Sequence, residues 1–414
     1  MRRSDSNVLE PPASPRERPV LGAAGVREPE PTHLVRPDLP PRPAWIEIDL
    51  RQLRRNFALI HRDKPAGLQV LSVVKDEAYG HGALQVARSA LAGGAACLGL
   101  CTLQEAVSLR DRGVRAPILL LGDRQENELS WCIGLELTCC VSERGTVACL
   151  DQLAARAGKT VPVHLKVNTG MNRYGVRWDR VGQLAGDLGS ARNLELAGVL
   201  SHFAQSDETD KSFALLQLAR FEEALGAVRE AGLSVNCRHL CNSGGFLDLP
   251  QAHFDMVRLG ILPLGVYPSS VCRRIPGILP VMTVKARIAG IQHLEPGDSV
   301  GYGMRYTATV PRRIAVLPIG YGDGFPRVRN QGFALIGGRR APLVGGVAMD
   351  ALTVDITDIP TARLWDETVL MGRQGDEEIT VHEIARLKNS VSYDVLTGWR
   401  ARLPRIYLDS EAGA

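Results

Sequence analysis

The sequence lacks any apolar run long enough to cross a membrane, and it lacks a large charge of either sign. Its longest apolar runs are of strand length, well short of the roughly 20 residues that a spanning helix needs. Its 49 basic and 45 acidic residues give a net charge of +4, and no basic block is interleaved with aromatic residues. These absences argue against a membrane protein and against nucleic acid as a partner.

The sequence also lacks zinc-ribbon cysteine spacing and a sustained apolar segment near its N-terminus. It has nine cysteines, and four of them, Cys97, Cys101, Cys139 and Cys140, lie within apolar runs. Cysteine in such runs usually behaves as a small buried hydrophobic residue. We therefore expect reduced core cysteines, no metal site, no secretory signal and a cytoplasmic protein.

The composition along the chain predicts an N-terminal tail followed by two domains. The first 43 residues are rich in proline and charge, which predicts a disordered tail. Residues 44–277 would form the first domain and residues 278–410 the second. The second has strand-like runs separated by glycine and proline without long helical connections, which is typical of an antiparallel β domain. The strand-like segment 44–50 lies outside the pattern of the first domain, and we expect it to join this β domain.

The first domain alternates short apolar runs with amphipathic segments of helical length. The eight runs are residues 70–75, 97–101, 117–122, 137–141, 163–167, 196–204, 238–243 and 256–261. Continuous apolar strands joined by helices indicate a parallel sheet buried on both faces, and eight such units predict a (β/α)8 barrel. The pattern alone leaves an open doubly wound sheet as the alternative.

Polar residues follow these runs at the ends where barrel strands converge on one mouth. They are Lys75, Lys166, Arg173, His202, Asn242, Ser243 and Arg258. Any one of them taken alone is as readily a solvated loop residue or a satisfied buried polar group. Lys75 ends the first run, where a dry environment disfavours a charged amine and favours a base or a covalent attachment point.

Nine motifs, in this order, resemble those of the alanine racemase family. They are "VVKDEAYGHGA", "KVNTGMNRYG", "SHFAQSD", "CNSGG", "DMVRLGI", "VGYGMRY", "PIGYGDGFPR", "GGVAMD" and "RLPRIY", and the resemblance runs from about Trp45 to Tyr407. It implies a barrel that binds pyridoxal 5'-phosphate, followed by a β domain. The implied activity is interconversion of L- and D-alanine, which supplies D-alanine for a bacterial cell wall.

The resemblance also implies roles for residues. Lys75 would attach the cofactor and act as base on one face of the substrate, and Tyr302 would be the base on the other. Arg173 would contact the substrate and lower the pKa of that tyrosine, and Lys166, often a carbamate in the family, would orient Arg173. Arg258 would donate to the pyridine nitrogen. His202 would pack on the cofactor ring, and the phosphate ligands would be Tyr79, Ser243, Gly260, Ile261 and Tyr393.

Three further residues of the β domain match the family. The Met349 amide would bind the substrate carboxylate, and Tyr321 and Asp350 would line the entrance. In the family these residues and Tyr302 complete the site of another subunit, which implies a head-to-tail homodimer with shared active sites.

The chain departs from the family pattern in three places. Asp76 and Glu77 follow the lysine where the family has small and asparagine residues, Asn168 replaces a common aspartate, and "LGILPLGVYPSS" lacks the usual aromatic-glycine pattern. A serine or broad-specificity racemase is therefore an alternative. Two others, a non-catalytic carrier of the cofactor and a decarboxylase, fit less well, because the carrier lacks an opposing tyrosine and the decarboxylase pairs the ring nitrogen with an acid.

Overall fold

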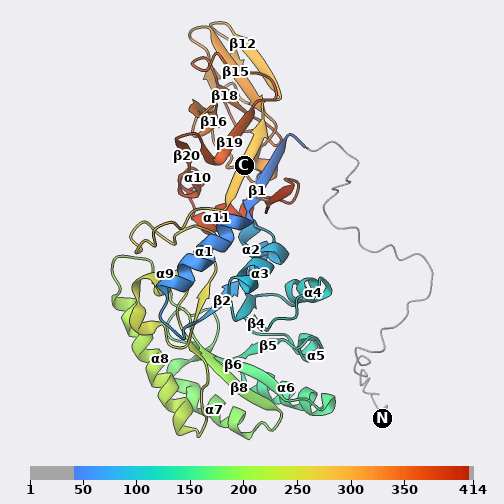
Figure 1. The fold of residues 1–414 in the computed structure, drawn as a ribbon, viewed down its shortest axis with the longest axis vertical. Coiled ribbons are helices and arrows are strands. Elements are labelled where there is room, and N and C mark those ends of the chain that lie inside the picture. Colours follow the sequence, from blue (N-terminus) through green and yellow to red (C-terminus); the bar gives the residue numbers. More distant parts are fainter. Residues whose placement is uncertain (1–41, 410–414) are drawn as a thin grey trace, which may run out of the picture.

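The structure is a computed structural model that describes residues 42–409. The barrel lies below and the β domain above it in Figure 1, and strand β1 (Ala44–Asp49) runs up into the β domain. The predicted tail, residues 1–43, lies outside the described residues except for Arg42 and Pro43. No helix within residues 42–409 is both long enough and apolar enough to span a membrane.

Eight parallel strands form the barrel, in the order β10-β2-β3-β4-β5-β6-β8-β9. They are β2 (Gln69–Val73), β3 (Cys97–Leu100), β4 (Ile118–Leu120), β5 (Thr138–Val141), β6 (Val161–Asn168), β8 (Leu194–Leu200), β9 (Arg238–His239) and β10 (Met256–Leu259). Each of the eight predicted apolar runs overlaps one of these strands.

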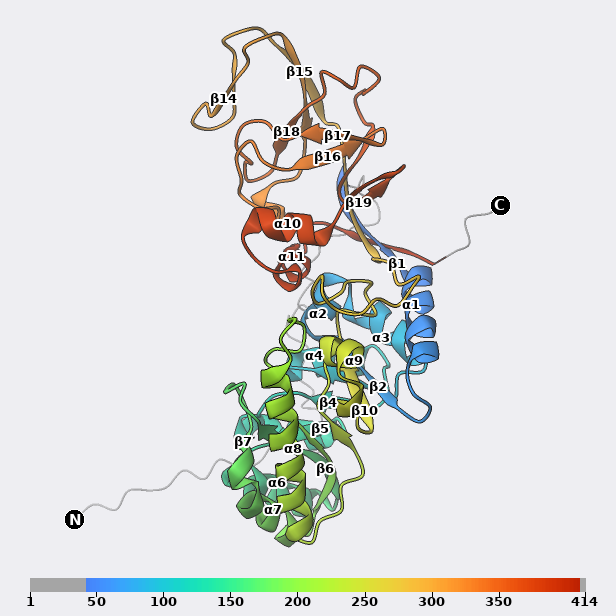
Figure 2. The same ribbon diagram turned by 90° about the vertical axis from the view of Figure 1, so that its left-hand side faces the viewer.

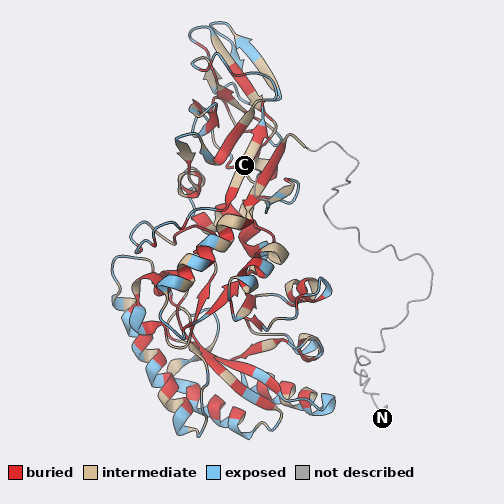
Figure 3. Ribbon diagram, in the orientation of Figure 1, coloured by how far each residue is buried: buried red, intermediate tan, exposed pale blue. Residues whose placement is uncertain are grey.

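The sheet curls round so that its last strand pairs with its first, β10 with β2. At the remaining seam, between β9 and β10, Asp255 N donates to Arg238 O (3.0 Å) and Arg258 N donates to Cys241 O (2.9 Å). The predicted barrel is confirmed, and the open sheet is excluded because its end strands would not meet. Figure 3 shows the strands buried while the outward faces of the helices are exposed, as a parallel sheet covered by helices requires.

Helices connect the strands and cover the outside of the barrel. They are α1 (Leu50–Asp63), α2 (Lys75–Gly80), α3 (Ala83–Ala92), α4 (Leu103–Asp111), α5 (Glu126–Gly134), α6 (Arg144–Ala157), α7 (Val181–Ser190), α8 (Ser212–Glu230) and α9 (Ser243–Asp248), with short elements β7 (Val176–Arg177), η1 (Trp178–Arg180) and η2 (Pro250–Ala252). The predicted apolar stripe of α8 is buried: Leu218, Phe221, Leu225 and Val228.

The β domain is mainly antiparallel. Its strands are β11 (Met282–Arg287), β12 (Gly290–Leu294), β13 (Ser299–Val300), β14 (Tyr306–Thr307), β15 (Arg312–Leu317), β16 (Phe333–Ile336), β17 (Arg339–Pro342), β18 (Leu352–Asp355), β19 (Glu367–Gln374), β20 (Glu377–Ile379) and β21 (Arg405–Leu408), with η3 (Tyr321–Asp323). As predicted, β1 belongs to this domain, pairing antiparallel with β11 and parallel with β21.

Two short helices, α10 (Val381–Lys388) and α11 (Ser392–Gly398), interrupt the mainly antiparallel β domain, and neither was predicted. A helical signal was present for α10, because Thr380 caps it and Val381, Ile384 and Ala385 form a buried stripe. Helix α11 packs against α2 at the top of the barrel, and a Cβ at Gly80 would lie 2.4 Å from Leu396 O. The two domains therefore meet at the segment that follows Lys75.

Candidate functional site

Lys75 stands at the barrel mouth, half-buried, where the chain leaves β2 and enters α2. The next four residues, Asp76 to Tyr79, have φ of 52°, 52°, 51° and 54°, so this turn is left-handed. A left-handed turn of non-glycine residues costs about 1–2 kcal/mol per residue and persists only where its surroundings hold it. No sequence pattern predicted this geometry, because non-glycine residues rarely adopt it.

Hydrogen bonds from three sides hold the turn. Glu105 Oε1 accepts from Asp76 N (2.6 Å), and Glu77 Oε2 accepts from Ala83 N (3.1 Å) at the start of α3. His81 Nδ1 lies 2.9 Å from the carbonyl oxygen of Tyr79. The side chains of Asp76 and Glu77, which depart from the family pattern, are exposed. The departure thus has a local structural use, since the Glu77 carboxylate caps the next helix.

Arg258 of β10 is the centre of the buried polar network. Its Nη1 donates to His239 O (2.9 Å) and His239 Nδ1 (3.0 Å), and its Nη2 donates to Ser201 O (2.6 Å), Leu240 O (3.0 Å) and His202 Nδ1 (3.0 Å). Burial lowers the pKa of Arg258 to about 10, which still leaves the guanidinium charged at neutral pH. The network therefore contains a buried cation held by neutral acceptors.

The arginine fixes the protonation of three histidines. A guanidinium only donates, so Nδ1 of His202 and Nδ1 of His239 must accept. His239 then carries its proton on Nε2 and donates it to His164 Nδ1 (2.8 Å). Burial, reinforced by Arg258, lowers the pKa of all three rings, that of His164 to about 4. We conclude that the histidines are neutral and each carries its proton on Nε2.

Lys166, Arg173 and His202 line one small cavity at the mouth. Lys166 is 7% exposed, donates to Leu121 O and lies 5.2 Å from the ring centre of Tyr174. Burial, with Arg258 and Arg173 nearby, lowers its pKa. The structure thus brings together three predicted site residues that come from residues 166–202, across two successive barrel strands.

Asn168 shapes the loop that carries Arg173. Its Oδ1 accepts from Gly170 N (3.0 Å) and from Asn172 N (3.1 Å), the pattern of an Asx turn. An amide oxygen serves here as a carboxylate oxygen would. The replacement of the family's aspartate therefore leaves the turn intact.

A second group of predicted residues meets at the start of α9, the turn after β10, and α11. The rings of Tyr79 and Tyr393 are 6.1 Å apart, and a Cβ at Gly260 would lie 2.4 Å from Tyr79 Oη. Leu262 N donates to Ser243 Oγ (3.4 Å). Burial raises the pKa of both tyrosines, so both hydroxyls keep their protons and can donate to an anion.

The predicted residues of the β domain form a separate group. Tyr302, on the turn between β13 and β14, is 83% exposed, and it lines a cavity of about 370 Å³ together with Tyr321 and Arg327. Gly322 N donates to Met349 O (2.8 Å), which fixes Met349 next to Tyr321. Figure 2 shows β14 at the end of the β domain away from the barrel. Within one chain, therefore, the structure does not bring Tyr302 to Lys75.

Buried charges support this second group. Asp323 is fully buried and receives Arg42 Nη1 (2.6 Å), Arg402 Nε (2.9 Å) and Gly320 N (2.9 Å). Arg402 also pairs with Asp350 at 2.5 Å. Residues from three distant parts of the chain thus position the loop of Tyr321.

Three residues that shape the barrel mouth were not among the predicted site residues: His164, His239 and Glu105. A signal existed for His164, because it lies two residues before Lys166 in a strand and so shares its inward face. His239 carried a similar signal within the run 238–243. Glu105 did carry a signal, because Thr102 and Glu105 have the spacing of a capping box at the start of α4. Its contact with the left-handed turn had none.

The comparisons with known proteins agree along most of the described chain. A sequence model of the alanine racemase N-terminal domain matches residues 48–268, and one of the alanine racemase C-terminal domain matches residues 281–407. An alanine racemase from Syntrophobacter fumaroxidans is 41% identical over 85% of this chain and 94% of its own.

Solved structures share the fold as well. The alanine racemase from Streptomyces lavendulae covers 90% of this chain and 99% of its own at 32% identity, with a TM-score of 0.84. A histidine racemase from Leuconostoc mesenteroides covers 90% of this chain and 99% of its own at 27% identity, with a TM-score of 0.81.

Proposed function

This chain belongs to the alanine racemase family, and on that premise we propose that it interconverts L-alanine and D-alanine with pyridoxal 5'-phosphate, using one base on each face of the substrate. The observation that carries the proposal is the pair of half-sites in one chain, Lys75 at the barrel mouth and the 83% exposed Tyr302 on the β domain. Racemisation removes a proton from one face of Cα and returns one to the opposite face, so it needs both bases.

The residues at the barrel mouth fit this cofactor. Lys75 would attach it covalently. Both Nη atoms of Arg258 donate to protein acceptors, whereas Nε has no acceptor among residues 42–409 and would donate to the ring nitrogen. His202 would lie against the ring, and the phosphate would be held by Tyr79, Ser243, Gly260, Ile261 and Tyr393. When bound, the cofactor supplies an electron sink for the bond electrons left on Cα.

Arg258 determines how strong this electron sink is. With a pKa of about 10 it stays charged at neutral pH, so it can donate a hydrogen bond to the ring nitrogen but gives up no proton to it. We expect this to favour return of the proton to Cα over competing reactions of the cofactor.

Tyr302 needs a nearby cation to act as a base. A phenol with an ordinary pKa of about 10 is a weak base at neutral pH, and a close positive charge lowers that value. Arg173 is exposed on the loop after β6 and would supply the charge, with Lys166 orienting it from the same cavity. Burial lowers the pKa of Lys166 and so favours the neutral amine that carbamylation requires.

We infer that the active enzyme is a head-to-tail homodimer in the cytoplasm. Tyr302 and Met349 are 83% and 52% exposed in the single chain, which is unusual for side chains that bind a substrate. Tyr302 of the partner subunit would face Lys75, the partner's Met349 amide would bind the substrate carboxylate, and the partner's Tyr321 and Asp350 would line the entrance. Each dimer would then have two complete sites.

A chiral assay on the purified holoenzyme tests the proposal. We expect racemisation of alanine in both directions, and we expect Lys75→Ala to lose both that activity and the visible absorbance of the lysine-bound cofactor. A Lys75→Ala protein that kept the absorbance band would contradict the attachment.

A racemase for larger amino acids is the second candidate, and the 27% identical histidine racemase of the same fold favours it. Initial rates with alanine, serine, histidine, lysine and arginine decide between the two. We expect alanine to be fastest, because Tyr79 and Tyr393, with rings 6.1 Å apart, narrow the pocket. Faster turnover of a long or cationic substrate would favour the second candidate.

A further inference from the structure

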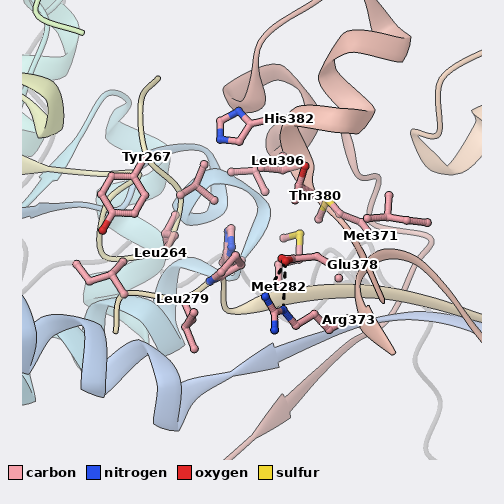
Figure 4. A pocket seen from close by; sticks show the side chains of 18 of the residues that line it. Leu264, Tyr267, Leu279, Met282, Met371, Arg373, Glu378, Thr380, His382 and Leu396 are labelled. Carbon is pink, nitrogen blue, oxygen red and sulfur yellow. Dashed lines mark hydrogen bonds and ion pairs between the residues drawn. The ribbon is translucent and has the colours of Figure 1, made fainter. Parts of the chain in front are cut away.

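A separate cavity lies between the barrel and the β domain and shares no lining residue with the two half-sites (Figure 4). Its volume is about 230 Å³, larger than the space that one water occupies. The apolar part of its wall comes from both domains and includes Leu264, Leu279, Met282, Met371 and Leu396. Such a wall favours a ligand with an apolar body.

Two polar side chains of the wall, Arg274 and His382, are free to bind a ligand. Arg274 is exposed on the loop after β10, and its guanidinium lies 4.0 Å from the ring centre of Tyr267. Its only hydrogen bond within residues 42–409 runs from Nη2 to Ser270 O at 3.4 Å. His382, in the first turn of α10, is partly exposed, and its ring has no hydrogen-bond partner among those residues.

The two side chains lie close enough to affect each other. Burial lowers the pKa of His382, and the positive charges of Arg274 and Arg386 lower it further. The His382 ring is therefore neutral at neutral pH and carries one N–H donor. This part of the cavity thus combines a guanidinium with an uncharged donor, which suits an anion.

The acidic side chains near these groups already have partners. Glu378 pairs with Arg373 at 2.9 Å, as Figure 4 shows. Glu383, on α10, pairs with Arg340 at 2.8 Å. Within the described part of the chain no carboxylate pairs with Arg274, so its charge remains available to a ligand.

The other polar groups of the wall offer a ligand little. Tyr267 Oη donates to Ile275 O (3.0 Å) and accepts from Ile275 N (2.9 Å). Thr380 Oγ1 accepts from Glu383 N (3.1 Å). His81 is fully buried, and its Nε2 is closed to solvent. Arg274 and His382 are therefore the groups that would fix the orientation of a ligand.

We propose that this cavity binds a small carboxylate with an apolar body, such as an aromatic or short-chain carboxylic acid. One carboxylate would accept hydrogen bonds from the Arg274 guanidinium and from the N–H of His382. The body would contact Leu264, Met282 and Leu396, and so bridge the two domains beside α11. The site does not depend on the proposed function.

Ligand-observed NMR on the holoenzyme tests the site, with alanine added to saturation so that the substrate site is filled. The probe is benzoate. Benzyl alcohol has the same ring without the charge, and acetate has the charge without the ring. We expect benzoate to bind more tightly than either by about tenfold, because a hydrogen bond to a charged group and the burial of a ring each contribute at least that factor.

Substitutions separate this site from the rest of the molecule. Arg274→Gln removes the charge and should weaken benzoate by about tenfold while leaving benzyl alcohol unchanged. His382→Leu removes a neutral donor and should weaken benzoate by a smaller factor, about fivefold. Arg88→Gln is the matched control: Arg88 is also exposed and donates to Arg112 O at 3.4 Å, but it does not line the cavity, so benzoate binding should not change.

A crystal soaked with 4-bromobenzoate locates the ligand even if a variant fails to fold. We expect the anomalous signal of bromine between Leu264 and Met282, with the carboxylate on Arg274. Equal affinity for benzoate and benzyl alcohol, unchanged benzoate binding in Arg274→Gln, or bromine only at the mouth near Lys75 would overturn the proposal. These readouts need no racemase activity, so they stay informative if the proposed function fails.

Discussion

The two half-sites of this chain are built in opposite ways. At the barrel mouth Arg258 is 3% exposed and its guanidinium donates to five acceptors. On the β domain Tyr302 is 83% exposed and Met349 is 52% exposed, and backbone hydrogen bonds hold the loop of Met349 against the turn that contains the buried Asp323. Folding alone therefore orders the first half-site, whereas the second presents its side chains to solvent.

This difference teaches how one chain can hold two parts of one catalytic site. A buried polar network needs all its partners in place when the chain folds, because each unmade hydrogen bond is costly. An exposed side chain has water as its hydrogen-bond partner when the chain folds, so it carries no such cost. It remains free to contact the surface of a second subunit afterwards. We therefore expect substitutions at the barrel mouth to lower the stability of the folded chain. We expect substitutions on the β domain to lower the activity that depends on assembly of two chains.

The largest expected effect comes from mixing two inactive variants, Lys75→Ala and Tyr302→Phe. Each homodimer lacks one base at every site. A mixed dimer has one intact site, so random exchange of subunits should restore about a quarter of the wild-type activity, since half the dimers are mixed and half their sites are complete. Activity of the mixture before and after exchange measures this.

Tyr302→Phe also has a directional effect on its own, because the phenol serves one face of Cα. We expect racemisation to fall equally in both directions, because the two enantiomers have equal free energies, but exchange of the Cα proton with solvent to be lost from L-alanine and kept, through Lys75, from D-alanine. If the mixture of variants stayed inactive after verified exchange, Tyr302 would not act across subunits and the comparison of half-sites would lose its functional meaning.

The next effect concerns pH and the buried histidines. Burial lowers the pKa of His164 and of His81 to about 4. The unfolded chain takes up protons on these rings near pH 6.5 while the folded chain does not, so stability falls as the pH drops from about 6.5 to 4. The slope should be up to about 1.4 kcal/mol per pH unit for each histidine.

Urea unfolding across this pH range measures the slope. His164→Asn removes one buried titratable ring, so the unfolding free energy should decline less steeply as the pH falls. Asn is chosen because its side-chain oxygen can still accept from His239 Nε2. His293→Asn, at an exposed ring of the β domain, is the control and should leave the slope as it is. An unchanged slope in His164→Asn would mean that this ring does not stay neutral in the fold.

The same contrast explains how much could be predicted from the sequence. The barrel followed from eight apolar runs, because burial on both faces leaves a strong signal in each strand. Lys166, Arg173 and His202 were placed at one mouth by their position after strands, and the structure brings them into one cavity. Local periodicity and topology were sufficient for these residues.

Other features depend on contacts that no local pattern records. The left-handed turn from Asp76 to Tyr79 needs Glu105, almost 30 positions away, and the protonation of His239 and His164 follows from Arg258. Helix α11 rests on Gly80 across the domain junction. Such features arise from tertiary contacts and could be recognised only once the fold was known.

A smaller effect on stability should come from adding a methyl group at Gly80, where the barrel and the β domain meet. In Gly80→Ala the new Cβ would lie 2.4 Å from Leu396 O, at a φ of 78°. Gly67→Ala is the matched control, because its φ is also 78° but nothing lies within 4 Å. We expect the control to lose about 1–2 kcal/mol of stability from backbone strain alone, and Gly80→Ala a further 1–3 kcal/mol or so from the clash.

Cofactor affinity distinguishes the two glycine variants further. Displacement of α11 would move Tyr393 away from Tyr79, so Gly80→Ala should bind pyridoxal phosphate more weakly, and Gly67→Ala should bind it normally. Absorbance titration of the apoenzyme measures both. Equal affinities would show that α11 does not support the phosphate end of the site.

The smallest effect is expected at the rim of the second half-site, where Asp350 pairs with Arg402 at 2.5 Å but both side chains are largely exposed, 62% and 45%. Asp350→Asn should change stability by less than about 1 kcal/mol, because water and salt screen such a pair. Asp323 is the other partner of Arg402, and its carboxylate is fully buried. Asp323→Asn should therefore lower the free energy of unfolding by about 3–5 kcal/mol, because it leaves the arginine charge unpaired. Thermal unfolding of both variants measures the difference. If the two lost equal stability, the loop of Tyr321 would not depend on buried support, and this part of the β-domain half-site would be less firmly held than its backbone contacts indicate.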